Sequence, residues 1–266
     1  MIIDFHTHCF TEKIAERAIS TLSANSGGLI PQTDGTAGGL IEHMDKSGVD
    51  ISCVMNIATN PKQMKAVNDF AASINGGRIV AFGSVHPDAE DWDEELDRIK
   101  ALGLSGVKLH PDYQGFFADE ERMKPIYRKI SELGLTVLFH AGFDYGFAPP
   151  YHNLPDNMIG ALKWLDTNVI AAHWGGVDVG LEVLEKLCGL PLYFDTSMGY
   201  GSVAPAIQKM LLEKHGANRF VFGSDCPWHS PAWEIRNLKT LGLSDEELDL
   251  IFYKNAKEIL GSIEGE

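Results

Sequence analysis

The sequence predicts an α/β fold, a closed (β/α)₈ barrel that forms a single domain over residues 1–266. Eight short apolar runs alternate with helix-like patterns, and such alternation implies a parallel sheet. The length matches the ~250 residues that a barrel of this kind typically needs. Neither a GxGxxG nor a GxxxxGK[ST] motif is present to favour an open, doubly wound sheet.

The expected strands are apolar runs rich in β-branched or aromatic residues, each four to seven residues long. In chain order they cover residues 2–8, 51–55, 79–85, 106–110, 136–140, 169–173, 192–195 and 219–223.

Helical spacing of apolar residues lies between these runs. It covers residues 40–48, 91–103, 123–134, 179–188, 203–215 and 244–260. Glycines 48, 103, 134 and 189 each precede a strand, as helix C-cap glycines do. Ser244 and Glu247 form a capping-box pattern at the start of the last helix. Residues 25–39 and 143–156 are expected to form long loops at the site.

Composition narrows the classes of protein and of partner. The formal net charge of −15 disfavours nucleic acid and anionic membrane surfaces as partners. Four scattered cysteines indicate neither a disulfide framework nor a structural zinc knot. We see no signal peptide and no apolar run near the ~20 residues that span a bilayer. A cytoplasmic enzyme with a small-molecule substrate is expected, and a homo-oligomer is compatible with the sequence.

Metal-ligand residue types end four of the expected strands. His6 and His8 project to one side of the first strand, with Asp4 on the same face and Phe5 on the opposite face. Three later strands end at His140, His173 and Asp225. Because strand ends converge on one face of a parallel barrel, these side chains should meet around one point.

The motifs resemble those of the amidohydrolase superfamily, in particular the amidohydrolase-related branch that includes aminocarboxymuconate-semialdehyde decarboxylase. The motifs that carry the resemblance are Asp4-Phe5-His6-Thr7-His8, His140, His173-Trp174-Gly175-Gly176, Gly223-Ser224-Asp225-Cys226-Pro227-Trp228 and Asn255-Ala256. The resemblance implies a distorted TIM barrel and one divalent metal held by His6, His8, His140 and Asp225. His173 is a metal ligand in some relatives and a substrate-polarising or proton-transfer residue in others.

Imidazole and carboxylate ligands suit zinc, which we expect first, and they also suit manganese or iron. A catalytic site of this kind keeps a position for water, and a carboxylate beside metal and water can take the water's proton. We therefore predict Asp225 and His173 as the catalytic residues, with Asp225 as the base.

Five further residues are predicted to contact substrate: Lys108, His110, Tyr145, Trp174 and Trp228. Each has a structural alternative. Lys108 either faces the substrate or forms a buried ion pair, and a similarly placed lysine is carboxylated in some binuclear branches of the superfamily. The two tryptophans either wall the pocket or pack, and Tyr145 belongs to an aromatic lid or to a small cluster under its loop.

Hydrolysis of an amide, lactone or ester-like carbonyl is the first functional hypothesis. Non-oxidative decarboxylation of a small aromatic or muconate-like acid is the alternative. Carboxylate substrates normally meet arginine, and the strand-end loops have almost none, so the sequence favours hydrolysis. A non-catalytic metal-binding barrel is a third, minor hypothesis.

Overall fold

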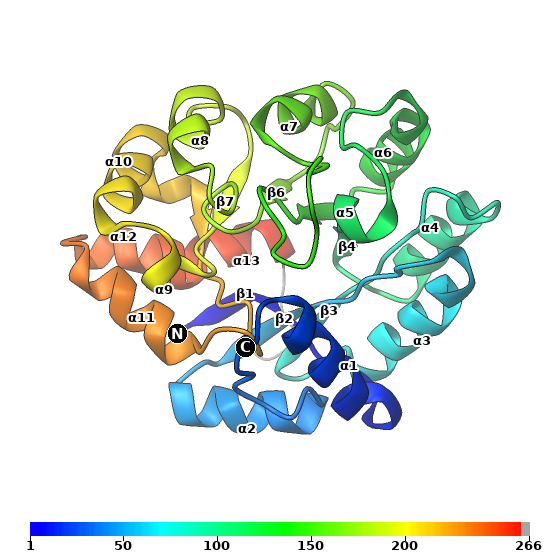
Figure 1. Cartoon of the computed structure of the whole chain (residues 1–266), viewed down its shortest axis with the longest axis horizontal. Coiled ribbons are helices and arrows are strands. Elements are labelled where there is room, and N and C mark those ends of the chain that lie inside the picture. The colour runs from blue at the N-terminus through cyan, green and yellow to red at the C-terminus, as the bar shows by residue number, and fades with distance from the viewer. Residues whose placement is uncertain (262–266) are drawn as a thin grey trace.

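The computed structural model describes residues 1–261 as eight short parallel strands inside a ring of helices (Figure 1). Residues 262–266, which the single-domain prediction includes, lie outside the described residues. The strands are β1 (Ile3–Thr7), β2 (Ile51–Met55), β3 (Ile79–Phe82), β4 (Gly106–Leu109), β5 (Thr136–Phe139), β6 (Val169–Ala171), β7 (Tyr193–Asp195) and β8 (Phe220–Val221). All eight coincide with the apolar runs of the sequence, so the predicted fold class is confirmed.

Two groups of strands pair continuously, β1 to β3 and β4 to β8. Backbone hydrogen bonds just beyond the strand ends bridge the two seams. Between β3 and β4, Gly83 N donates to Gly106 O at 2.9 Å, and Lys108 N donates to Gly83 O at 2.8 Å. Between β1 and β8, Phe5 N donates to Phe222 O at 2.7 Å. The eight strands therefore enclose one interior.

The α-helices surround this barrel. They are α1 (Glu12–Asn25), α2 (Ala37–Ser47), α3 (Met64–Ile74), α4 (Trp92–Ala101), α5 (Pro111–Gln114), α6 (Lys124–Glu132), α7 (Pro155–Leu162), α8 (Gly180–Lys186), α9 (Gly199–Ser202), α10 (Pro205–His215), α11 (Pro231–Thr240), α12 (Asp245–Asp249) and α13 (Asn255–Leu260). Short 3₁₀ segments are η1 (Pro61–Gln63), η2 (Glu121–Met123) and η3 (Ala217–Arg219), and a π-helical segment, η4 (Leu250–Lys254), joins α12 to α13. None of the helices within residues 1–261 has both the length and the apolar character needed to cross a bilayer.

Local sequence signals explain where several helices begin and end. Gly48 caps α2 in the left-handed conformation, at φ 72°, which costs glycine little because it has no Cβ. Ser244 and Glu247 form the expected capping box at the start of α12. The six predicted helices are present, whereas α1, α3, α7, α11 and the short helices α5 and α9 were not predicted. Most of α1 precedes the predicted loop at residues 25–39.

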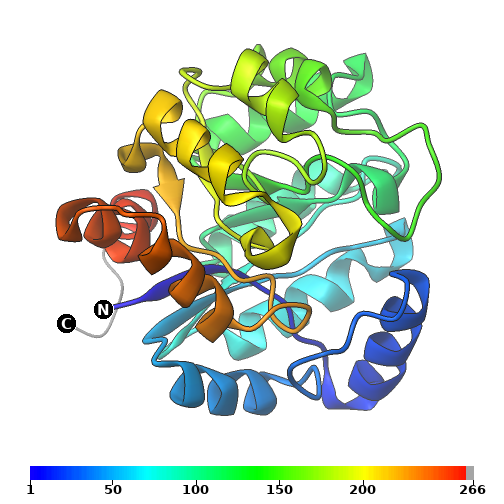
Figure 2. The ribbon, with the colours of Figure 1, turned by 60° about the vertical axis from the view of Figure 1, so that its left-hand side comes forward.

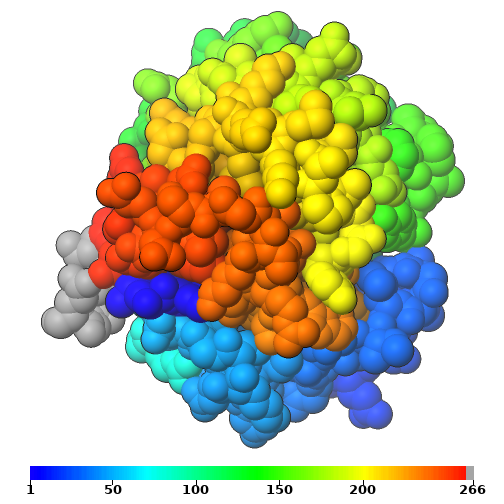
Figure 3. All heavy atoms as spheres, turned by 90° about the vertical axis from the view of Figure 1, so that its left-hand side faces the viewer, coloured from blue at the N-terminus to red at the C-terminus, as the bar shows by residue number. Residues whose placement is uncertain are grey.

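The apolar side chains divide into an inner and an outer core. The inner core fills the lower barrel, where α13 closes it with Ala256 and Ile259. The outer core lies between the strands and the helices. Figure 3 shows the first residues of the chain, in dark blue, next to the C-terminal helices, in red. A backbone hydrogen bond from Phe222 N to Ile251 O, at 2.8 Å, connects the segment between these helices to the end of β8.

A β-bulge in β1 corrects one prediction. The pairing of β1 with β2 shifts register between Asp4 and Thr7, so β1 carries an extra residue there. Phe5 belongs to the inner core, where its ring packs edge-on against Phe82 with centroids 5.7 Å apart. Simple alternation placed Phe5 on the face opposite His6. The bulge breaks that alternation and lets the apolar core and the histidine pair occupy the same interior.

We expect His215, at the end of α10, to make the fold less stable in mild acid. Its Nδ1 accepts from Gly189 N at 2.9 Å and its Nε2 donates to Leu192 O at 3.0 Å, so both nitrogens are satisfied in the neutral form. Burial lowers the pKa of His215 from 6.5 to about 4. Between these values the unfolded chain binds a proton that the native protein does not, so the free energy of unfolding should fall as the pH drops.

Urea unfolding at pH 7 and pH 4.5 of wild type and His215→Phe tests this. Between pH 7 and pH 4.5 the free energy of unfolding of wild type should fall by up to about 3 kcal/mol more than that of the variant, at ~1.4 kcal/mol per pKa unit. Phenylalanine keeps the ring stacked on Phe194, 4.2 Å away between centroids. An equal pH dependence in the two proteins would contradict the prediction.

Candidate active site

A cavity of about 500 Å³ opens at the carboxyl ends of the strands. Figure 2 shows helix α1 and the long loop after β5 on the same side of the molecule, and both contribute to the cavity wall. The predicted site residues that line the cavity are His6, His8, Lys108, His110, His140, Tyr145, His173, Asp225 and Trp228. The barrel therefore brings together residues that are separated by more than 200 positions.

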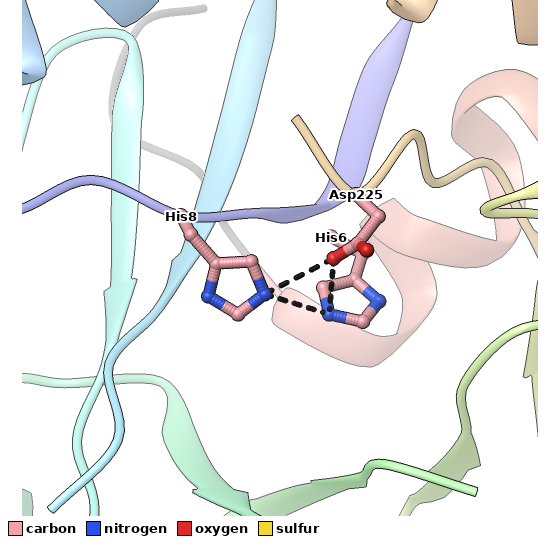
Figure 4. A group of neighbouring side chains, drawn as sticks. All are labelled: His6, His8 and Asp225. Carbon is pink, nitrogen blue, oxygen red and sulfur yellow. Dashed lines mark hydrogen bonds and ion pairs between the residues drawn. The ribbon is translucent and has the colours of Figure 1, made fainter. Parts of the chain in front are cut away.

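His6, His8 and Asp225 form a compact triad (Figure 4). The His8 Nε2 atom lies 3.1 Å from Asp225 Oδ1 and 3.2 Å from His6 Nε2. His6 Nε2 lies 3.4 Å from the same carboxylate oxygen. The backbone adds to this grouping, because Asp225 N donates to His6 O at 2.8 Å.

The far sides of the two imidazoles fix their protonation. His6 Nδ1 faces Asp195 Oδ2 at 2.7 Å, and His8 Nδ1 faces the carbonyl oxygen of Met55 at 2.8 Å. A carboxylate and a carbonyl only accept, so both Nδ1 atoms carry the proton. Both Nε2 atoms are then bare lone pairs that face each other and a carboxylate oxygen. Three acceptors this close need a cation or a shared proton between them.

His140 and His173 form a second chain of hydrogen bonds. The Ser197 hydroxyl donates to Asp195 Oδ1, so Ser197 Oγ accepts from His173 Nδ1 at 2.8 Å. His173 Nε2 therefore accepts a hydrogen bond from the protonated Nδ1 of His140, 3.1 Å away. This leaves His140 Nε2 as a lone pair, and that atom is buried with no hydrogen-bond partner.

These hydrogen-bond directions leave acceptor lone pairs on His6, His8, His140 and Asp225, the four residues that the family resemblance implies as ligands. Burial lowers the pKa of His6 and of His140 well below the usual range, which keeps both imidazoles neutral. Burial opposes ionisation of Asp225, but the adjacent His6, His8 and Lys108 outweigh it and hold its carboxyl pKa below the ordinary value. Neutral imidazoles and an ionised carboxylate are the forms that bind a divalent metal, so the donor set fits one.

The structure does not place His140 inside the compact triad. Its ring is grouped instead with His110 and Asp144. The His110 and His140 rings stack at 4.1 Å between centroids, 7° from parallel. Because His110 Nδ1 accepts from Tyr113 N, its Nε2 donates to Asp144 Oδ2, 3.2 Å away. His110 is therefore held by its own pair of contacts, beside the ligand candidates.

Lys108 lies in the floor of the cavity and is 1% exposed. Its Nζ lies 3.2 Å from His6 Nε2, within hydrogen-bond distance of the lone pair that a metal would use. Burial lowers the pKa of Lys108 to about 8, against the opposing charges of Asp195, Asp225 and Asp144. Lys108 is thus a buried cation that lines the cavity, and the direct polar contact of its Nζ is His6 and not a carboxylate.

The aromatic residues divide between the cavity and the core. Trp228 lines the cavity, and Tyr145, which is 49% exposed, lies at its edge. Trp174 does not line this cavity. Its indole is buried, donates to Thr196 O at 2.9 Å and packs on Phe220, next to a second cavity. For Trp174 the packing alternative matches the observed position, and substrate contact does not.

Sequence reasoning missed several residues of this site. Asp195 was not identified as the partner of His6, and Asp144 was not identified at all. Two apolar helix faces that line the cavity, on α1 and α3, were also missed. The spacing of Ile14, Ala18 and Leu22 is helical and was a signal for the first of them.

Comparisons with known proteins place the chain by both sequence and fold. Residues 3–262 match the model of the amidohydrolase family. A search of curated proteins finds no match. Among solved structures, an uncharacterized TIM-barrel protein from Bordetella bronchiseptica is similar at 19% identity, with a TM-score of 0.79 over 97% of this chain and 98% of that one.

Two further similar structures carry functional names. The 5-carboxyvanillate decarboxylase of Sphingomonas paucimobilis is 16% identical, with a TM-score of 0.72 over 97% of this chain and 98% of that one. A probable 2-pyrone-4,6-dicarboxylic acid hydrolase of Acinetobacter baumannii is 20% identical, with a TM-score of 0.70 over 98% of this chain and 99% of that one. Identities this low show the shared fold. The family match, which spans nearly the whole sequence, shows that the chain belongs to the amidohydrolase family.

Proposed function

We propose that this protein is a metal-dependent hydrolase that directs a water molecule at the amide, lactone or ester-like carbonyl of a small molecule. The observation that carries the proposal is the set of free acceptors on His6, His8, His140 and Asp225, facing a cavity large enough for a small-molecule substrate. A closed structural metal site needs no such cavity, which argues against a non-catalytic barrel.

His6, His8, His140 and Asp225 would hold one divalent metal, with zinc first and manganese or iron as alternatives. Such an ion supplies Lewis acidity, which polarises a carbonyl and lowers the pKa of water. In this site Asp225 acts as the general base, because its lowered pKa keeps it ionised and its carboxylate lines the cavity.

The remaining cavity residues bind and position. Lys108 is a hydrogen-bond donor at the cavity floor, where it can hold the carbonyl or the leaving group, and His110 lines the cavity beside it with its Nε2 proton on Asp144. Trp228 and Tyr145 contact the rest of the substrate. His173 lines the cavity and orients His140 through the bond from His140 Nδ1, so we assign it to positioning and proton transfer and not to metal binding.

Decarboxylation is the second candidate, since a buried cation such as Lys108 can receive one carboxylate. The similar structures include a named decarboxylase and a named hydrolase, so the comparisons favour neither reaction. The cavity favours hydrolysis, because no arginine lines it among the described residues.

Replacing Asp225 by Asn should lower turnover by about 10²–10⁴, the usual contribution of a general base. Asparagine keeps the size and one ligand oxygen but cannot take a proton. The assay presents esters, lactones, N-acyl compounds and aromatic carboxylic acids to metal-loaded protein in ¹⁸O-labelled water. Hydrolysis puts one ¹⁸O into the product acid, whereas decarboxylation releases CO₂. Release of CO₂ without ¹⁸O incorporation, or full activity in the Asn variant, would contradict the proposal.

His6→Ala and His8→Ala should each remove most bound metal and activity while the barrel stays folded. Each variant loses one Nε2 lone pair of the proposed ligand set, and none of the triad residues belongs to the inner core. Metal content by mass spectrometry and far-UV circular dichroism check this. Stoichiometric metal in the double variant would exclude the triad as the metal site.

His173→Asn should retain stoichiometric metal at saturation but bind it about 10–100-fold more weakly, the scale found when a residue that orients a ligand is removed. The physical reason is that the His173 Nε2 lone pair is already occupied by His140 Nδ1. Metal titrations of His173→Asn and His8→Ala are compared. Equal loss of stoichiometry in the two variants would show that His173 is itself a ligand.

A further inference from the structure

The outer part of the cavity differs in character from its metal end. Helix α1 lines it with Ile14, Ala18 and Leu22, which are four residues apart and so share one face of the helix. The neighbouring α1 residues Ala15 and Ile19 are buried against the rest of the protein. The α1 face toward the cavity is therefore a second apolar stripe that no core residue covers.

Helix α3 forms a second apolar wall of the same cavity. Ala66 and Val67 line it, and Phe70 follows one turn further along that helix. Phe10, Ile57 and Leu29 add further apolar surface from the loops after β1 and β2 and from the segment that follows α1. A large apolar lining next to a few polar groups is the usual composition of a small-molecule site.

Positive charge in the cavity is confined to its metal end. Among the described residues that line it, Lys108 is the one lysine, and no arginine is present. Lys108 lies deep, at 1% exposure, with its Nζ 3.2 Å from His6 Nε2 and away from the outer cavity. A second acid group on the substrate, placed against α1 and α3, would lose its hydration without gaining a cation. Such uncompensated burial of a charge is strongly unfavourable.

We propose that the site accepts a carbonyl compound with one apolar substituent, aryl or alkyl, and excludes compounds with a second acid group at the far end. The carbonyl lies at the histidines and Lys108, and the apolar substituent lies between the faces of α1 and α3. This inference rests on the proposed function for the identity of the reacting group and deepens it by naming the substrate class.

Binding of product-like acids tests the proposal without relying on turnover. Benzoate, 4-butylbenzoate and benzene-1,4-dicarboxylate are titrated into metal-loaded protein by calorimetry. A buried methylene favours binding by roughly fourfold. We therefore expect 4-butylbenzoate to bind at least about tenfold more tightly than benzoate, and the dicarboxylate at least about tenfold more weakly than 4-butylbenzoate.

A charge placed on the apolar wall should reverse this preference. Ala18→Arg puts a guanidinium in the outer cavity, so it should weaken the binding of 4-butylbenzoate and strengthen the binding of the dicarboxylate. Thr21→Arg is the matched control, because Thr21 lies on the same helix but is exposed and does not line the cavity. The control should leave all three affinities unchanged. Ala66→Arg on α3 gives an independent version of the test should circular dichroism show that Ala18→Arg disturbs the fold.

The outcomes separate this inference from the proposed function. A dicarboxylate that binds wild type as tightly as 4-butylbenzoate overturns the inference, even if hydrolysis is observed. Absence of binding by all three acids, or equal affinities in both wall variants and wild type, also overturns it. The expected order of affinities without hydrolysis of any ester or amide supports the apolar ligand class and contradicts the proposed reaction.

Discussion

The carboxylate of Asp195, at the end of β7, is the group on which the site depends. It is fully buried. It accepts hydrogen bonds from His6 Nδ1, from the backbone amides of His173 and Ser197, and from the Ser197 hydroxyl. One anion thereby decides the tautomers of His6 and His173 and, through His173, that of His140. A residue that hydrogen-bonds to one nitrogen of a ligand histidine determines that the other nitrogen is free to bind metal. Asp195 therefore determines where the acceptors of this cavity point.

The backbone is strained at two strand ends of this site. After β6, the φ angle is 59° at both His173 and Trp174, and after β8 it is 66° at Asp225. Non-glycine residues adopt this left-handed region only at an energetic cost. Hydrogen bonds hold each turn: Trp174 N donates to Asp195 O, and Asp225 N donates to His6 O, both at 2.8 Å. The tight turns aim His173 and Asp225 back over the barrel, where the side chains meet β1.

The strands and the metal candidates could be predicted because both depend on local patterns. Apolar runs ending in His140, His173 and Asp225 need only a closed parallel barrel to converge. The role of Asp195 could not be found this way, since its partner His6 is 189 residues away and the contact exists only in the folded barrel. Likewise, the bulge that turns Phe5 inward arises from pairing between β1 and β2 and leaves no mark in the residue types. Trp174 was misplaced because its motif lies next to His173, although the turn sends its indole to the core.

The division of the cavity suggests how one framework serves different reactions and substrates. The acceptors are held in place by the strand ends and by Asp195, whereas the apolar walls come from α1 and α3, which follow β1 and β2. Among the described contacts, these two helices make no hydrogen bond to the groups bonded to Asp195. A change on those helix faces alters which substrate fits without moving a ligand. In the function that we propose, the strand ends supply the chemistry and the walls select what reaches it. Specificity in this chain should therefore be sought on the two helices, and reactivity on the strands.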